Sequence, residues 1–399
     1  MEKVKLGEIA LLINGDRGKN YPSQEDITDD GEVPFVNAGH LNGKNIDYSD
    51  MNYISQEKYE KLSSGKFEKG DILYCLRGSL GKKAIVNDEV RGAIASSLVI
   101  IRPDRKKVNG DYLMFSLDAP TIREQLTKAN NGSTQPNLSA SSVREFRIEL
   151  PTLLVQKDVV EKLTKLQHVI EKRQNQINLL DKLVKARFVE MFGDPVHNSL
   201  NQPVLPMTDV CEIIDGDRGV NYPKQEDFYN DEHCLFLNAK NVTKKGFDFS
   251  ECMFITKEKD EQLRKGKLKR GDVVLTTRGT LGNIAFYTKD IPFDNVRINS
   301  GMVILRLNRD IIDETFFIEQ FRMQVDSIKT FVASGSAQPQ LPISTMNKIK
   351  VLMPDLELQK QYSQIIEQTD KSKVVVPSKI KNTIFAIMLS VSFGQITSI

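Results

Sequence analysis

An internal repeat constrains this chain of 399 residues more than any other feature of its sequence. Residues 13–26 read INGDRGKNYPSQED, and residues 214–227 read IDGDRGVNYPKQED, 201 positions later. At the same offset, GDILYCLRGSLGKKAI (70–85) matches GDVVLTTRGTLGNIAF (271–286). An offset that is held over such distances is not a chance result. The sequence therefore predicts one structural unit that is used twice.

The offset between the two copies grows by only two residues towards their ends. GSTQPNLS (132–139) pairs with GSAQPQLP (335–342) at an offset of 203, and Gln156 then pairs with Gln359. The repeat thus includes the start of the segment that follows each copy.

Each copy has the pattern of a mixed α/β unit. Short β-branched runs predict strands, polar segments with spaced apolar residues predict packed helices, and the Arg-Gly pairs at 77–78 and 278–279 predict turns. The predicted strands are Asp71–Cys75, Ser97–Ile101, Asp272–Thr276 and Met302–Leu305, and the predicted helices are Tyr112–Lys128 and Glu314–Thr330.

A run of forty residues without Pro or Gly, Leu153 to Phe192, follows the first copy. Its apolar residues are spaced alternately by three and four, which is the seam of a coiled-coil helix, with a polar interruption at Arg173. Gly193 and Pro195 supply an end signal. The helix would span roughly 60 Å. The predicted seam consists of Leu163, Leu166, Ile170, Ile177, Leu180, Val184 and Met191.

A second helix is predicted after the second copy, beginning near Asp355. Residues 356–373 keep an amphipathic pattern, but Val374-Val375-Val376-Pro377 interrupts it. A proline inside a helix costs about 3 kcal/mol. We therefore expect the second helix to be shortened, kinked or partly disordered beyond this point.

The predicted fold class is α+β, with two similar α/β units separated by two long antiparallel coiled-coil helices in a pseudo-two-fold dumbbell. The expected boundaries are 1–151 for the first unit, 152–194 for the first helix, 195–354 for the second unit and 355–399 for the second helix.

A dimerisation coiled coil is an alternative reading of the first helix. The repeat disfavours it, because it gives that helix a partner within the chain. The outer face of the first helix, with Lys182, Lys185, Arg187 and Phe188, could still dock another subunit.

Composition limits the possible partners and compartment. The formal net charge is +2, from 55 Lys+Arg against 53 Asp+Glu. Any contact with nucleic acid must therefore come from local basic patches. The four cysteines have no metal or redox spacing and are read as buried or incidental thiols. The N-terminus lacks a signal-peptide core, and no apolar run is long enough to span a bilayer, so we expect a cytoplasmic protein without membrane contact.

Catalytic patterns are missing from the sequence. The glycines of Gly78-Ser79-Leu80-Gly81-Lys82 are too close together for a P-loop, and no G-x-G-x-x-G follows a predicted strand. The four histidines have no metal-like spacing, and no Asn-Pro-Pro-aromatic tetrapeptide marks an adenine methyltransferase. The sequence predicts neither a catalytic residue nor a metal site.

Three repeated loops carry the candidate DNA contacts. Arginine can donate two hydrogen bonds to guanine or contact phosphate, asparagine and glutamine can read base edges, and tyrosine can stack. Gly-rich turns let backbone N–H groups approach phosphate. In each loop a purely structural role is an open alternative: a closed turn, a tight hairpin, or a partner-facing loop. The candidates are Arg17, Asn20, Tyr21, Arg218, Asn221 and Tyr222 in the first loop, Arg77, Ser79, Lys82, Arg278 and Thr280 in the second, and Gln135 and Gln338 in the third.

The order of these phrases resembles the specificity subunit of a type I restriction–modification system over nearly the whole chain. The phrases are FVEMFGDP (188–195), DILYCLRGSLGK with DVVLTTRGTLGN, GSTQPNLS with GSAQPQLP, and LPTLLVQ with MPDLELQ, which open the two helices. Each phrase alone is weak, but their order and duplication are specific.

The resemblance implies that each unit is a target recognition domain, which reads one half of a bipartite double-stranded DNA target through the major groove. The two helices would set the spacer between the halves. The chain itself would be non-catalytic. Two modification (methyltransferase) subunits would bring S-adenosylmethionine, and restriction subunits would add ATP- and Mg-dependent translocation and cleavage.

Two departures from the family pattern carry expectations of their own. The second helix loses its charged amphipathic ending after Lys373, so assembly through it is expected to be weak or altered. The two recognition units are more alike than is usual in the family, which predicts related half-sites in inverted orientation. The alternatives from other classes are a protein-interaction scaffold and a fused restriction–methylation enzyme. The second is disfavoured because the repeat occupies the chain.

Overall fold

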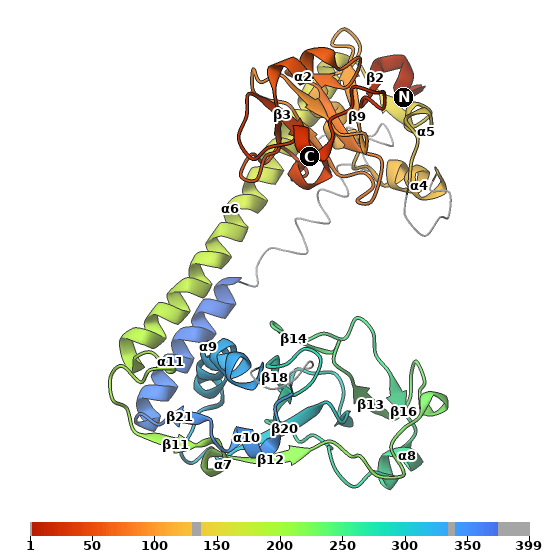
Figure 1. Ribbon diagram of the computed structural model, residues 1–399. Coiled ribbons are helices and arrows are strands. Elements are labelled where there is room, and N and C mark those ends of the chain that lie inside the picture. The colour runs from red at the N-terminus through yellow and green to blue at the C-terminus, as the bar shows by residue number, and fades with distance from the viewer. Residues whose placement is uncertain (1, 130–136, 334–339, 374–399) are drawn as a thin grey trace. The chain divides into compact units, whose positions relative to one another are not determined.

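The computed structural model describes residues 2–129, 137–333 and 340–373 (Figure 1). The chain divides into two compact units, and the division falls within helix α6 (Leu153–Phe192). Unit 1 contains the described residues up to Arg173, and unit 2 those from Gln174 onward. Both units mix helices with small sheets, as predicted. The candidates Gln135 and Gln338 and the segment after Lys373 lie outside the described residues.

Unit 1 is built on two four-stranded sheets and one two-stranded ladder. The first sheet has the order β2-β9-β6-β7 and is antiparallel throughout, and the second has the order β4-β3-β8-β5 with β3 and β8 parallel. Strand β1 pairs with β10 beside the start of α6. The strands are β1 Glu2–Lys5, β2 Ala10–Asn14, β3 Val33–Val36, β4 Tyr53–Ile54, β5 Lys66–Phe67, β6 Ile72–Cys75, β7 Lys83–Ile85, β8 Gly92–Ile94, β9 Leu98–Pro103 and β10 Arg147–Leu150.

The first sheet of unit 1 is buried on both faces, which explains the continuous apolar runs of its central strands. Side chains alternate along a strand, so Ile72 and Tyr74 point to one face and Leu73 and Cys75 to the other. The first pair packs with the helices, including Leu163 of α6. The second pair packs with the second sheet. The sheet therefore fixes the start of α6 on one side and the loops of the second sheet on the other.

The segment predicted as one helix, Tyr112–Lys128, forms two: α3 (Gly110–Ser116) and α4 (Pro120–Ala129). Pro120 is the reason, because proline is tolerated in a first helical turn but not inside a helix. The corresponding segment of unit 2 has no proline and forms the single helix α9 (Glu314–Ala333), as predicted. The other helices of unit 1 before α6 are α1 Leu6–Ile9, α2 Gln56–Lys61 and α5 Ala140–Arg144.

Unit 2 repeats the strand order of unit 1 with small differences, among them an added two-stranded ladder, β14-β15. Its main sheet, β12-β20-β17-β18, matches β2-β9-β6-β7, and its second sheet, β16-β13-β19, keeps the parallel central pair. The strands are β11 Val204–Pro206, β12 Cys211–Asp215, β13 Cys234–Leu237, β14 Val242–Thr243, β15 Gly246–Phe247, β16 Phe254–Ile255, β17 Val273–Thr276, β18 Ile284–Phe286, β19 Val296–Ile298, β20 Met302–Leu307 and β21 Lys350–Leu352. The helices besides α9 are α7 Met207–Val210, α8 Lys257–Gln262, α10 Ile343–Met346 and α11 Leu356–Lys373.

Helix α6 has the bounds that the sequence predicts, and it ends as predicted. The N–H of Gly193 donates to the carbonyl of Val189 at 2.9 Å, and Gly193 adopts φ 82°. This is the left-handed C-cap conformation that favours glycine. The Asp194 carboxylate then accepts backbone N–H groups at Val196 and His197. The phrase FVEMFGDP is therefore a helix stop followed by a closed turn.

The end of α6 is part of the core of unit 2. The rings of Phe188 and Phe192 lie 5.1 Å apart by centroid, and each contacts Phe316 of α9 and Tyr362 of α11. The expectation that Phe188 lies on an exposed docking face is therefore wrong, because this side chain is fully buried. Lys182 and Lys185 are exposed, as expected.

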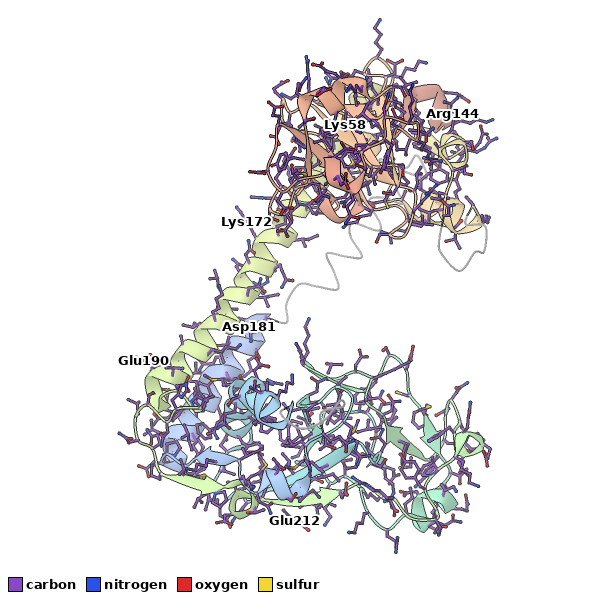
Figure 2. All side chains as sticks on the ribbon, viewed as in Figure 1. Lys58, Arg144, Lys172, Asp181, Glu190 and Glu212 are labelled. Atoms are coloured by element: carbon purple, nitrogen blue, oxygen red, sulfur yellow. The ribbon has the colours of Figure 1, made fainter. Side chains whose placement is uncertain are left out.

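Helix α11 runs antiparallel to the end of α6, as predicted (Figure 1). Tyr362, near the start of α11, donates from its hydroxyl to the Val184 carbonyl at 3.2 Å and contacts Phe192. Lys373, at the described end of α11, lies 2.8 Å from the Asp181 carboxylate, which Figure 2 marks on α6. Residues later in α11 therefore contact residues earlier in α6, which is the order expected of antiparallel helices.

Candidate nucleic-acid interface

The first repeated loop is closed by a buried aspartate. Asp16 follows β2, and its Oδ1 accepts the N–H of Gly18 at 2.6 Å. Its Oδ2 accepts the N–H and the hydroxyl of Ser63, at 2.7 and 2.8 Å. The hydrogen bond from Gly18, helped by those from Ser63, holds the pKa of Asp16 below its usual value although burial opposes this. These bonds favour the charged form of the carboxyl group.

Unit 2 closes the same loop in the same way. Asp217 accepts the N–H groups of Gly219 and Arg264, each at 2.7 Å. Burial raises the pKa of this carboxyl group, but the backbone hydrogen bonds from Gly219, Arg264 and Lys265 together leave it lowered. The G-D-R-G phrase is therefore a turn in which the aspartate has a structural role in both units.

The asparagine and tyrosine candidates of the first loop have structural partners in unit 1. Asn20 donates to the carbonyl of Lys61 at 2.9 Å. The Tyr21 hydroxyl accepts the N–H of Ser96 at 3.3 Å, and its ring meets Phe35 edge-on at 5.9 Å.

The corresponding residues of unit 2 make the same contacts. Asn221 donates to the carbonyl of Gln262 at 3.3 Å. Tyr222 accepts from the N–H of Ser300 at 3.4 Å and packs on Phe236 at 5.8 Å. The structural role is thus visible for Asn20, Tyr21, Asn221 and Tyr222, and their contact with DNA stays a prediction.

The arginines of the first loop are exposed. Arg17 donates to the carbonyl of Ser96 at 3.3 Å, and Arg218 donates to the carbonyl of Ser300 at 3.3 Å. Arg218 also donates to the Asp215 carboxylate at 3.2 Å. Each guanidinium has five N–H donors, so these bonds still leave donors available to a ligand. Of the first-loop candidates, these two are the best placed to contact DNA.

The second loop presents a further arginine in each unit. Arg77 and Arg278 are exposed, and the structure gives neither guanidinium a hydrogen bond or ion pair among the described residues. Gly78 and Gly279, with φ 76° and 71°, make the turn that follows each arginine. The turn is therefore of the predicted kind, with a surface arginine at its start.

The remaining second-loop candidates differ in their surroundings. Lys82 is partly buried, and its Nζ donates to the carbonyls of Ala38 and Gly39, at 2.9 and 3.3 Å. Thr280 is exposed and donates to the carbonyl of Ala239 at 3.5 Å. Ser79 is exposed at the tip of the turn. Lys82 and Thr280 thus tie the second loop to the segment after β3 or β13.

The third loop is described only at its end, and this end lies against the second loop. The N–H of Leu138 donates to the carbonyl of Leu76 at 2.8 Å, and Arg77 forms a β-bridge with Asn137. In unit 2, Leu341 donates to the carbonyl of Thr277 at 3.1 Å. The third phrase therefore ends beside the arginine of the second loop in both units.

The three loops of unit 1 meet at one cleft, which we call the arginine cleft. Its volume is about 390 Å³. No acidic side chain is among its lining residues, which besides the two arginines include two asparagines, two serines and two apolar residues. The lining residues are Asn14, Arg17, Arg77, Asn137, Leu138, Ser139, Ala140 and Ser141. Such a surface is suited to an anionic ligand.

Sequence reasoning missed the polar lining of this cleft beside the arginines. Asn14 ends β2 two residues before Asp16, Ser139 is the N-cap of α5, and Ser141 lies in its first turn. The signal that could have found Asn14 lies in the repeat. Asn14 is aligned with Asp215, so a neutral side chain in the first copy corresponds to an acidic one in the second.

Other kinds of site are not visible in the part of the chain that the structure describes. Across residues 2–129, 137–333 and 340–373, no three His, Cys, Asp or Glu side chains are grouped as a metal site. Cys75, Cys211 and Cys234 are buried free thiols, and Cys252 is half-buried. Burial raises the pKa of Cys211 to about 12. No described helix is both long and apolar enough to cross a membrane.

Comparison with known proteins identifies the family to which both units are similar. The family model for the type I restriction modification DNA specificity domain matches twice, at residues 1–179 and 203–385. The type I restriction enzyme MjaIX specificity subunit of Methanocaldococcus jannaschii is 22% identical over 92% of this chain and 87% of its own length. The EcoBI specificity subunit of Escherichia coli is 23% identical over 39% of this chain and 32% of its own length.

Solved structures show the same fold. The S subunit of a type I restriction–modification system from M. genitalium has a TM-score of 0.54 at 16% identity, covering 98% of this chain and 94% of that chain. A chain from a structure of type I R-M complex assembly and conformational transition has a TM-score of 0.55 at 16% identity, covering 98% and 97%. With two family matches that span most of its length, the chain belongs to the type I restriction–modification DNA specificity family.

Proposed function

We propose that this chain is the DNA-specificity subunit of a type I restriction–modification complex, in which each unit reads one half of a bipartite target. The observation that carries the proposal is the pair of exposed arginines in each unit, Arg17 with Arg77 and Arg218 with Arg278. Both pairs lie on loops of the two domains that the family model matches.

In each unit, hydrogen bonds tie the two arginine loops to one neighbouring segment. In unit 1 both arginine loops join the segment Ser96–Ser97, through Arg17 to the carbonyl of Ser96 and through Leu76 to the carbonyl of Ser97. In unit 2, Arg218 and the backbone of Arg278 bond Ser300 and Gly301. Fixed loops lower the entropic cost of binding, and arginine donates to guanine O6 and N7 or to phosphate.

The helices supply the rest of the proposed assembly. Helix α6 and its antiparallel partner α11 would set the spacer between the half-sites. They would also dock two modification subunits, with Lys182 and Lys185 among the exposed residues on α6.

We propose that the chain is non-catalytic and cytoplasmic. S-adenosylmethionine, ATP and Mg would then bind partner subunits, and restriction subunits would complete the complex. The family match disfavours a scaffold without DNA.

The test measures DNA binding by the full chain together with its methyltransferase subunits. Arg17→Ala and Arg218→Ala should each weaken binding by about 1–3 kcal/mol if the side chain reads a base. Arg147→Ala, an exposed arginine on β10, serves as the control and should leave affinity unchanged. Unchanged affinity and specificity in both test variants would remove the first loops from the interface. Absence of any DNA binding by the complex would favour a scaffold.

A further inference from the structure

The two units differ at the residue that ends the first strand of each main sheet. Asn14 ends β2, and Asp215 occupies the same place at the end of β12. The strand registers agree, since Asn14 pairs with Val99 on β9 and Asp215 with Val303 on β20. One repeat position thus carries a neutral amide in unit 1 and a carboxylate in unit 2.

The carboxylate of Asp215 changes the surroundings of the first-loop arginine. In unit 2, Arg218 donates to Asp215 Oδ1 at 3.2 Å, and both side chains are partly exposed. In unit 1, Arg17 shares its cleft with Asn14 and Arg77, and no acidic residue lines the cleft. In unit 1 no negative charge lies in the cleft beside Arg17 and Arg77. In unit 2 the Asp215 carboxylate lies beside Arg218.

The rim formed by the third phrase changes in the same direction. Ser139 and Ala140, which line the arginine cleft, correspond to Pro342 and Ile343 in unit 2. Ile343 is 36% exposed, and a proline has neither the hydroxyl nor the N–H of the serine that it replaces. Unit 2 thus has fewer donors and more apolar surface at the matching rim.

We propose that the arginine cleft of unit 1 holds a phosphate of the DNA backbone, and that Asp215 excludes phosphate from the matching position in unit 2. This inference rests on the proposed function. A phosphate in unit 1 would lie between two guanidinium groups, with the amides of Asn14 and Asn137 as further donors. At the matching place in unit 2 a phosphate would lie beside the Asp215 carboxylate, and the two negative charges would repel each other.

The proposal makes the two units unequal in their contribution to non-specific binding. Contacts with phosphate position a protein on DNA and release counterions, whereas contacts with bases carry the sequence information. Each phosphate contact changes the slope of log K against log salt by about 0.9 on B-form DNA. The difference between the units is therefore measurable without knowledge of the target sequence.

The experiment exchanges the two residues. The full chain, assembled with its methyltransferase subunits, is titrated with a mixed-sequence duplex over a series of salt concentrations. Asn14→Asp should lower the magnitude of the salt slope by about 0.9, and Arg77→Gln should do the same. Asp215→Asn should increase the magnitude of the salt slope. We expect the fold of unit 1 to tolerate Asn14→Asp, because unit 2 has aspartate at the matching position, Asp215.

Asn201→Asp is the matched control, since it adds the same charge at an exposed residue outside both sets of loops. Its φ of 51° is tolerated by asparagine and aspartate alike. If Asn14→Asp changes the salt slope no more than Asn201→Asp does, the proposed phosphate site is wrong. An unchanged slope in Asp215→Asn would overturn the exclusion. If the unsubstituted complex does not bind DNA, the proposed function itself fails, which is a separate result.

Discussion

Asp16 shows how a residue of a conspicuous motif can have a structural task. Its carboxylate joins the first loop to Ser63, which is 47 positions away in the chain. The sequence predicts a closed turn or a DNA contact for this loop, but no pattern in it identifies a partner so distant. The sequence also leaves open whether Asn20 and Tyr21 face DNA or the protein. Their partners, Lys61 and Ser96, are 41 and 75 positions away in the chain.

Replacing Asp16 should destabilise unit 1. Asp16→Asn loses the charge that two backbone N–H groups and a hydroxyl favour, so we expect the free energy of unfolding to fall by about 1–3 kcal/mol. Urea denaturation measures this, and hydrogen exchange at the amides of Gly18 and Ser63 localises it. Asp30→Asn, at an exposed position in the same unit, is the control. Equal stability of the two variants would contradict the structural role.

The stabilising effect of Asp16 should depend on pH in a defined direction. Its pKa in the folded chain is below the usual value, so the unfolded state takes up a proton first as the pH falls. The stability difference between the unsubstituted chain and Asp16→Asn should be full above about pH 5 and shrink below about pH 4. Denaturation at several pH values tests this. A difference that grows towards low pH would show the opposite sign of coupling.

At the scale of elements, α6 shows what the sequence could predict and what it could not. The absence of Gly and Pro and the Gly193 stop define its bounds. The heptad pattern predicts a seam that is interrupted at Arg173, and the buried residues lie towards the two ends of the helix: Leu163 in the core of unit 1, and Val184 with Phe188 in that of unit 2. Periodicity finds the apolar face but not the element that covers it.

Phe188 should be essential for the junction of α6, α9 and α11. Phe188→Ala removes a fully buried ring from this aromatic cluster and should cost about 3–5 kcal/mol of unfolding free energy. Leu183→Ala, on the same helix but 57% exposed, should change it by less than about 0.5 kcal/mol. Thermal or urea denaturation compares the two. Similar costs would mean that Leu183 is covered and that the packing described for Phe188 is wrong.

Gln156 and Gln359 fasten the start of each long helix to its own unit. Both are fully buried. Gln156 accepts the N–H of Asn109 at 2.7 Å and donates to the carbonyls of Lys107 and Pro151. Gln359 makes the same three bonds, to Asp313, Ile311 and Pro354. This explains why the repeat extends beyond the globular units.

Gln156→Leu should leave these backbone groups without partners and cost about 2–4 kcal/mol. Faster hydrogen exchange of the Asn109 amide would locate the loss. Gln174→Leu, at an exposed position of the same helix, should have little effect on stability. If Gln156→Leu is as stable as Gln174→Leu, the buried hydrogen bonds do not hold the helix start in place.

At the scale of the whole molecule, the duplication was the most informative feature of the sequence. It correctly predicted two units of one topology, because aligned phrases require aligned strands. The positions where the copies differ are visible in the sequence, but the structural effect of each difference is not. Pro120 splits one helix of unit 1, and Asp215 adds a charge in unit 2, and each is a single substitution whose effect depends on its neighbours.

The expectation of related, inverted half-sites stays a prediction. The phosphate inference does not contradict it, because a phosphate contact carries no sequence information. Arg17 and Arg218, which the two units share, would give similar readouts only through N–H donors that the phosphate beside Arg17 leaves free to contact bases. Differences between the half-sites should then concentrate at bases near the third loops, whose lining residues differ most.

The central claim is that this chain directs modification to a bipartite DNA target. Its most direct test is to map methylated adenines across the genome of a host that carries this chain with its cognate methyltransferase. The proposal predicts one motif of two short specified halves separated by a non-specific spacer of fixed length, and the loss of that motif when the chain is deleted. Methylation at a single continuous motif, or a pattern that does not depend on the chain, would contradict it.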